Sequence, residues 1–386
     1  MATDSPSSST RSAAAGLASG AVAAPSRRLT PAAATRLWAE APTAELRRLA
    51  HARRLAVTAP HRVTYLVDRN INYTNVCITD CQFCAFYRPP GHPEAYVNSR
   101  EAIGSKIAEL VAAGGTRILM QGGHHPDLRL PWYEDLLIWI RREFPAIEIN
   151  AFSPSEIDHI ATLEGLSAEI VLSRLAAAGL RGLPGGGAEI LDDQVRSRVS
   201  PKKQKAADWL AVMAIAQRLG LTTTASMVIG FGESVSERLN HLEALRAHQD
   251  RAHAAHGNGF TAFIVWTAQF ENTSLGASRF RPVYGAGREE YLRHLALARL
   301  YLDNFDHIQA SWPTMGPEVA QEALSYGADD FGSTMLEENV VSAAGTVRTR
   351  MDAAEIRRFI REAGFVPAQR DSRYAILREF ATEERG

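Results

Sequence analysis

The segment that governs the fold is residues 117–154, which reads RILMQGGHHPDLRLPWYEDLLIWIRREFPAIEINAFSP. Residues 117–120 and 147–152 are short, mostly apolar runs of the kind that form buried strands. Residues 131–143 carry apolar side chains at the three- and four-residue spacing of a helix. A polar loop containing two glycines, 121–127, joins the first strand to the helix. Strand, helix and strand in this order predict a βαβ unit with two parallel strands.

The same pattern recurs along most of the chain. Helical periodicity is found at 100–113, 131–143, 154–178, 205–219, 235–252 and 289–302. We expect strands at 63–67, 117–120, 147–152, 179–183, 223–229, 260–266 and 307–311, with a weaker pattern at 328–332. About eight such units predict an α/β fold, a (β/α)8 TIM-type barrel that is full or nearly closed. A doubly wound open sheet is the alternative, but polar and glycine-rich segments follow nearly every strand, where barrels build their active sites.

Composition shifts divide the chain into four parts. We expect an Ala/Ser-rich disordered tail at 1–29 and N-terminal helices at 30–60. The barrel is expected at 61–345 and a C-terminal extension, with a helix at 353–363, at 346–386.

Charge and hydropathy exclude several classes of protein. The 42 Lys and Arg against 43 Asp and Glu leave a net charge of −1, so no basic surface is expected for nucleic acid or an anionic membrane. No run of about 18 apolar residues predicts a membrane-spanning helix. Three cysteines in 386 residues do not make a disulfide framework, which predicts a reducing compartment, the cytoplasm.

All three cysteines, Cys77, Cys81 and Cys84, fall within eight residues. Thiolates are soft ligands that suit iron and zinc. A four-iron cluster normally takes four cysteines, so three would leave one iron open to a ligand from outside the protein. A zinc site completed by a histidine and a metal-free redox sensor are the alternatives.

The C-x3-C-x2-C spacing, with Phe83 directly before the last cysteine, resembles the radical S-adenosylmethionine (SAM) superfamily. The resemblance implies a [4Fe-4S] cluster on Cys77, Cys81 and Cys84, with SAM chelated to the open iron. It also implies cleavage of SAM to a 5'-deoxyadenosyl radical, driven by a reductant such as flavodoxin or ferredoxin.

The expected contacts with SAM lie in glycine-rich segments after predicted strands. The resemblance places Gln121-Gly122-Gly123 at the ammonium of SAM and the segment from Gly230 to Glu233 at its adenine. The triple glycine 185–187 permits close approach of a ligand, so Glu189 is expected to reach the ribose hydroxyls. The full set of cofactor-binding candidates is Phe83, Gln121, Gly122, Gly123, Ser153, Glu189, Gly230 and Glu233. The glycine segments are equally well explained as packing turns.

Longer segments, 68–77, 84–88, 121–127, 184–191 and 330–341, resemble the cyclic dehypoxanthine futalosine synthase family of the futalosine route to menaquinone. The resemblance covers about residues 45–375. It implies a small-molecule substrate, dehypoxanthine futalosine, whose ribose C4' loses hydrogen and adds to the benzoate ring, with loss of an electron and a proton. Aminofutalosine synthase and the deazaflavin-forming synthases share parts of these segments and remain alternatives, as does a zinc-stabilised barrel without activity.

Polar residues after the predicted strands are the candidates for binding and catalysis. The substrate-binding candidates are Asn72, Tyr73, Gln269, Ser311 and Trp312. The base is sought among His125, Asp127 and Glu156, and the sequence does not choose between them. Lys202, Lys203 and Arg198 were the cations available for a carboxylate, although a solvated, basic start of a helix is the preferred interpretation.

Some positions depart from the pattern of the family. Glu148 and Asn150 stand where many relatives carry histidine, and Val265 and Phe270 stand where proline is common. These differences keep open an altered substrate.

Overall fold

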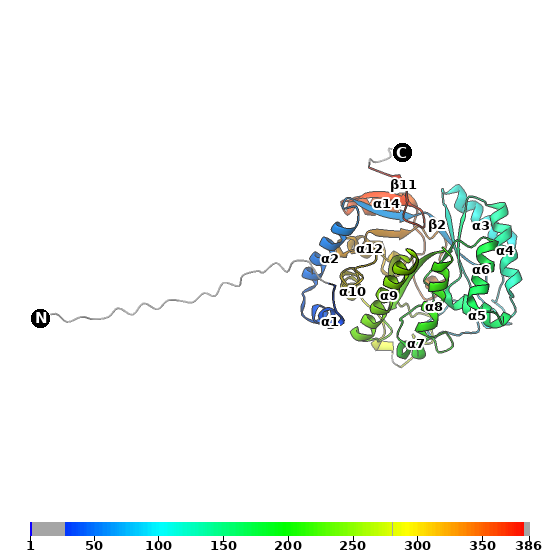
Figure 1. Cartoon of the computed structure of the whole chain (residues 1–386), viewed down its shortest axis with the longest axis horizontal. Coiled ribbons are helices and arrows are strands. Elements are labelled where there is room, and N and C mark those ends of the chain that lie inside the picture. The colour runs from blue at the N-terminus through cyan, green and yellow to red at the C-terminus, as the bar shows by residue number, and fades with distance from the viewer. Residues whose placement is uncertain (2–27, 280, 382–386) are drawn as a thin grey trace.

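In this computed structural model the described residues are 28–279 and 281–381, with Met1. They form one sheet of strands curled into a barrel, with helices around its outside (Figure 1). Every neighbouring pair of strands is parallel except β10 and β11. The strands are β1 (Arg62–Leu66), β2 (Asp68–Asn72), β3 (Arg117–Gln121), β4 (Glu148–Ala151), β5 (Gly182–Leu183), β6 (Thr222–Ile229), β7 (Phe260–Thr267), β8 (His307–Gln309), β9 (Asp330–Ser333), β10 (Val366–Arg370) and β11 (Ile376–Glu379).

The barrel closes through the continuous segment 62–72. Its first half, β1, pairs with β9, and its second half, β2, pairs with β3, so one extended segment joins the two sides of the sheet. The barrel fold is therefore confirmed, with the sequence order of the strands following the order of the sheet from β3 to β9. The prediction ended this strand at residue 67, because Asp68, Asn70 and Asn72 have low strand propensity. All three side chains are buried, and Asn70 lines the cavity inside the barrel.

Helices between the strands cover the outside of the barrel (Figure 1). The predicted single helix 154–178 is two helices, because Gly165 ends the first in the left-handed conformation (φ 66°) and Ser167 caps the second. The helices of the layer are α3 (Arg100–Ala112), α4 (Leu130–Glu143), α5 (Pro154–Glu164), α6 (Ala168–Ala178), α7 (Asp193–Val199), α8 (Ala206–Arg218), α9 (Val235–His256), α10 (Arg288–Tyr301), α11 (Trp312–Met315), α12 (Pro317–Ala323), α13 (Val340–Ala343) and α14 (Ala353–Glu362). None of the helices described has the length and apolar character needed to cross a membrane.

Two further helices, α1 (Pro31–Glu40) and α2 (Thr43–Val57), precede the barrel and pack on α9 and α10. Arg293 of α10 donates to the carbonyls of Trp38 and Ala41, which ties the two helices down. The tail predicted at 1–29 lies outside the described residues, apart from Met1, Arg28 and Leu29.

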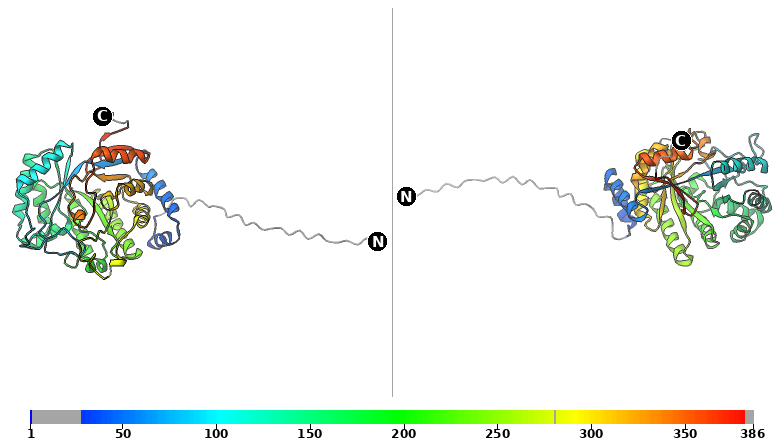
Figure 2. Two further views of the ribbon diagram at one scale, coloured as in Figure 1. Left: turned by 180° about the vertical axis from the view of Figure 1, so that it is seen from behind. Right: turned by 90° about the horizontal axis from the view of Figure 1, so that it is seen from above.

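The C-terminal extension is part of the barrel wall. β10 pairs with β1 in register from Arg62↔Val366 to Tyr65↔Gln369, and β11 returns antiparallel to it. The loop between them crosses the amino-terminal end of the barrel, which we call the floor. There Ser372 contacts Asn150 of β4, Arg373 donates to the carbonyl of Gly220, and the Tyr374 ring stacks on His307 at 3.7 Å. Figure 2 shows this segment over the barrel from a second side.

Candidate functional site

The loop that carries Cys77, Cys81 and Cys84, which we call the cysteine loop, follows the carboxyl end of β2. Thr79 Oγ1 lies 2.8 Å from Cys77 Sγ and 3.8 Å from Cys81 Sγ, and the Cys84 amide donates to the Cys81 carbonyl at 3.0 Å. All three are free thiols. Burial is the main cause that raises the pKa of Cys81 to about 11 and that also raises the pKa of Cys84. Metal binding must therefore displace protons from Cys81 and Cys84.

The loop after β3 that contains Gly122 and Gly123, which we call the glycine loop, packs against the cysteine loop. The His124 amide donates to Cys77 Sγ at 3.3 Å, and the Ile78 amide donates to the His124 carbonyl at 3.2 Å. A Cβ atom on Gly123 would lie 2.2 Å from the Val76 carbonyl oxygen and 2.7 Å from Cys77 Cβ. Only glycine therefore lets the two loops meet.

The donor set fits an iron–sulfur cluster. One loop carries all three thiols, and soft thiolates are the usual protein ligands of such clusters. Among the described residues, no three His, Cys, Asp or Glu side chains gather around the position of a single ion. A cluster takes one thiolate per iron and needs no such gathering, so Cys77, Cys81 and Cys84 would hold three of its irons.

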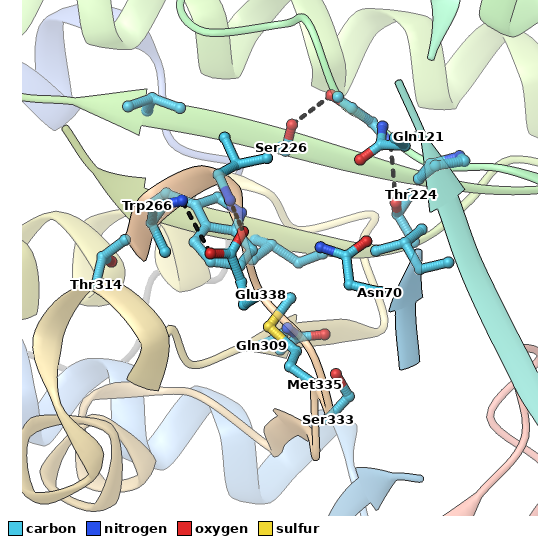
Figure 3. A pocket seen from close by; sticks show the side chains of 18 of the residues that line it. Asn70, Gln121, Thr224, Ser226, Trp266, Gln309, Thr314, Ser333, Met335 and Glu338 are labelled. Carbon is cyan, nitrogen blue, oxygen red and sulfur yellow. Dashed lines mark hydrogen bonds between the residues drawn. The ribbon is translucent and has the colours of Figure 1, made fainter. Parts of the chain in front are cut away.

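The interior of the barrel holds a cavity of about 290 Å³, which begins beside the cysteine loop at Phe83 and Cys84 and reaches the floor at Arg370 and Tyr374. In Figure 3 the side chains of Asn70, Gln121 and Glu338 point into this space from different elements. Of the predicted site residues, the cavity is lined by Phe83, Cys84, Gln121, Glu189 and Gln269, together with the glycines 185–187.

Glu156 and Tyr73 lie behind the cavity wall. Glu156 accepts from Tyr73 Oη at 2.7 Å, Ser153 Oγ at 2.8 Å and the Gly122 amide at 3.0 Å. Burial raises the pKa of this carboxyl to about 7. Because protein donors surround it, Glu156 holds the glycine loop in place and is poorly placed to act as a base. The hydroxyls of Tyr73 and Ser153 are bonded to Glu156, so these two residues are poorly placed to contact a ligand directly.

The other two predicted bases lie outside the lining of the cavity. The Asp127 amide donates to His125 Nδ1 at 3.1 Å, and the His125 carbonyl bonds His159 Nε2 at 2.9 Å. Asp127 is exposed. These contacts shape the loop after β3, and the geometry does not favour a catalytic role for either residue.

Glu189 meets the cavity beside a buried lysine. Lys203 Nζ donates to Glu189 Oε1 at 2.8 Å and lies 5.6 Å from the centre of the Phe83 ring. The preferred interpretation of this segment as a solvated helix start is therefore wrong for Lys203, whose side chain is 14% exposed. Lys202 and Arg198 are exposed and pair with Asp80 and Glu237.

The remaining predicted contacts serve the barrel wall. Glu233 accepts from the Gly230 amide at 2.9 Å and the Phe231 amide at 2.6 Å, which closes the loop after β6. Trp312 Nε1 donates to the Ser333 carbonyl at 2.9 Å, and Tyr291 Oη binds the Ser311 amide at 2.8 Å. Asn72 Nδ2 donates to the Gln121 carbonyl at 3.2 Å. The predicted contacts Glu233, Ser311, Trp312 and Asn72 do not line the described cavity.

The sequence interpretation missed much of the lining, including the polar residues Asn70, Arg117, Glu338 and Tyr374. Glu338 accepts from the amides of Val340, Val341 and Ser342, and burial raises its pKa. A signal existed for Arg117, which has the same strand parity as Gln121 and therefore faces the same side. No sequence signal indicated Tyr374, because it lies on the loop between β10 and β11, far in sequence from the other lining residues.

Two family models match the chain. The radical SAM superfamily matches residues 71–245, and the CofH/MqnC C-terminal region matches 257–383. A cyclic dehypoxanthine futalosine synthase from Halalkalibacterium halodurans is 48% identical over 83% of this chain and 84% of its own. One from Streptomyces coelicolor is 44% identical over 92% and 87%.

More distant comparisons agree in fold. An aminodeoxyfutalosine synthase from Thermus thermophilus is 35% identical over 82% of this chain and 84% of its own. The crystal structure of methylornithine synthase superimposes with a TM-score of 0.67 at 17% identity, covering 89% of this chain and 95% of that one.

Proposed function

The chain belongs to the radical SAM superfamily and, within it, to the family of the cyclic dehypoxanthine futalosine synthases, and on that premise we propose that it closes the ring of dehypoxanthine futalosine. The observation that carries the proposal is the identity with two such synthases, which extends over 83% and 92% of the chain. The identities of 48% and 44% with these synthases are higher than the 35% identity with the aminodeoxyfutalosine synthase, so we favour the ring closure as the reaction.

The cavity supports this chemistry. When bound, the cluster and SAM supply a 5'-deoxyadenosyl radical that takes hydrogen from the ribose C4'. Cys84 and Phe83 place the cluster end of the site at the cavity, and Arg370 and Tyr374 line its other end at the floor. The substrate thus reacts in an enclosed barrel interior that orients it and protects a carbon radical.

We propose that Glu338 accepts the proton that the ring loses after the closure. It is a lining carboxyl group whose oxygens, among the described residues, accept hydrogen bonds from backbone amides alone, whereas the lining carboxyl of Glu189 is paired with Lys203. Burial raises the pKa of Glu338 towards the pH of the reaction, which suits a group that must accept a proton.

The electron donor and the compartment follow from the same chemistry. A flavodoxin or a ferredoxin would reduce the cluster, and a reducing cytoplasm would keep three thiols free for it. Both stay predictions.

The test is to incubate the reduced protein with SAM and dehypoxanthine futalosine without oxygen. We expect a cyclic product and 5'-deoxyadenosine in equal amounts by mass spectrometry. Turnover of the two precursors of aminodeoxyfutalosine instead, with no cyclic product, would replace the proposal by the neighbouring activity.

A further inference from the structure

The floor of the cavity carries a cation with unused hydrogen-bond donors. Arg117 is the first residue of β3, and Arg117, Leu119 and Gln121 all line the cavity from one face of that strand. Arg117 and Gln121 are four positions apart, a distance of about 13 Å along the strand. Arg117 therefore lies at the end of the cavity opposite the cysteine loop.

The two arginines that line the cavity differ in what their donors do. Arg370 gives Nε and Nη2 to Asp330 and Nη1 to the Asp371 carbonyl, so each of its nitrogens is engaged. Arg117 gives only Nη2, to Asp68, and its buried Nε has no partner among the residues described. Asp68 does not line the cavity, so it holds the guanidinium from behind and leaves the other donors facing inward.

Other polar atoms near Arg117 are also unpaired among the described residues, including Asp68 Oδ1 behind it. Asn70 is 6% exposed, and its Oδ1 has no partner within the described part of the chain. The buried hydroxyl of Tyr374 likewise has none there. A buried polar group without a partner costs about 1–3 kcal/mol. The free donors of Arg117 and Tyr374 indicate that an acceptor group of a ligand completes them, whereas Asn70 Oδ1 can only accept and calls for a donor.

We propose that this floor binds the carboxylate of the substrate, through Arg117 and the Tyr374 hydroxyl, with the Asn70 amide beside them. The proposal rests on the proposed function, whose substrate carries a benzoate. A guanidinium and a hydroxyl both donate, and charge-assisted bonds from arginine are the strongest that a carboxylate receives in proteins.

The consequence is an orientation. With its carboxylate at the floor, the benzoate occupies the lower barrel, and the sugar points to the cysteine loop where the radical forms. The cations considered from the sequence, Lys202, Lys203 and Arg198, pair elsewhere and do not line the cavity. Arg117 takes the role that they were considered for.

The test compares two substrates, dehypoxanthine futalosine and its carboxamide, on the SAM-loaded enzyme. We expect Arg117→Gln to raise the KM and the calorimetric Kd for the carboxylate about 10- to 100-fold, the loss of one or two charge-assisted bonds, with a much smaller change for the carboxamide. Since Arg117→Gln leaves Asp68 unpaired, the double variant Arg117→Gln/Asp68→Asn provides a folded, charge-neutral form with the same expected selectivity. Arg181→Gln, an exposed arginine before β5, is the matched control and should bind both as the wild type does.

Two outcomes separate the claims. If the wild type makes the cyclic product and both Arg117 variants keep the wild-type ratio of KM values for the two substrates, the carboxylate site is wrong and the function stands. If the wild type neither binds nor converts dehypoxanthine futalosine, the proposed function falls and the site falls with it.

Discussion

Glu156 is a carboxyl whose role differs from the one that its position in the sequence indicates. It is fully enclosed, and its pKa of about 7 lies above the ordinary value of 4.5 because burial disfavours the ionised form. The folded chain therefore retains a proton that the unfolded chain releases. Its contribution to stability is present below about pH 4.5, is lost as the pH rises to about 7, and is then constant.

Glu156→Gln removes this dependence. Gln keeps an oxygen for Tyr73 and Gly122 and offers its amide nitrogen to Ser153. We expect the free energy of unfolding of the variant, relative to the wild type, to improve by on the order of 3 kcal/mol between pH 4.5 and 8, at about 1.4 kcal/mol per pKa unit. Urea unfolding across this range measures it, with the exposed Glu40→Gln as control. Parallel curves for variant and wild type would refute the pKa assignment.

Glu338 lines the cavity and is the carboxyl group that we propose as the proton acceptor. Glu338→Gln keeps the shape but accepts no proton, so we expect cyclic product to form about 10²- to 10⁴-fold more slowly. Formation of 5'-deoxyadenosine should fall much less, because the proton leaves after the hydrogen transfer. The exposed Glu318→Gln is the control. Equal losses of both products would show that Glu338 acts earlier.

Among the elements, the contact between the cysteine loop and the glycine loop is the tightest of the site. Gly123→Ala forces a Cβ against the Val76 carbonyl, which is backbone and cannot move without the cysteine loop. We expect the variant to fold yet to assemble much less cluster, measured as iron and sulfide per chain. Gly287→Ala, where a Cβ meets nothing within 4 Å, should bind iron normally. Full iron content in Gly123→Ala would contradict the packing argument.

A second pair of elements, β9 and β10, is joined by Arg370 and Asp330. Both side chains are buried, at 4% and 0% exposure. Arg370→Met leaves the Asp330 charge unpaired, which costs about 3–5 kcal/mol. Adding Asp330→Asn should restore much of this. Arg358→Met, which breaks an exposed pair with Glu362, should cost under about 1 kcal/mol in the same unfolding experiment. A small loss for Arg370→Met would mean that β10 is not anchored through this pair.

The elements that the sequence predicted are those with a local signature. Apolar runs predicted the strands from β3 to β9, although β5 is much shorter than expected. β2 escaped prediction because polar residues alternate along it. β10 escaped because it pairs with β1, some 300 residues away, and no local pattern encodes such a register. β11 pairs only with β10, so it depends on the same distant contact.

At the scale of the whole molecule, the cysteines and glycines were predictable because their spacing is local and chemically specific. The interior of the barrel was not, because its lining comes from many strands and from the C-terminal loop. Asn70, Arg117 and Tyr374 meet only once the barrel is closed. Predicted contacts such as Ser311 and Trp312 follow strands but turn into the wall, a direction that the sequence pattern does not contain.

The central claim is that a radical formed at the cysteine end of this cavity takes hydrogen from the ribose C4' of the bound substrate. The most direct measurement uses dehypoxanthine futalosine deuterated at that carbon, with the reduced protein and SAM. The account predicts one deuterium in the 5'-deoxyadenosine that is formed and none left at C4' of the cyclic product. Unlabelled 5'-deoxyadenosine, or a product that keeps the deuterium, would contradict it.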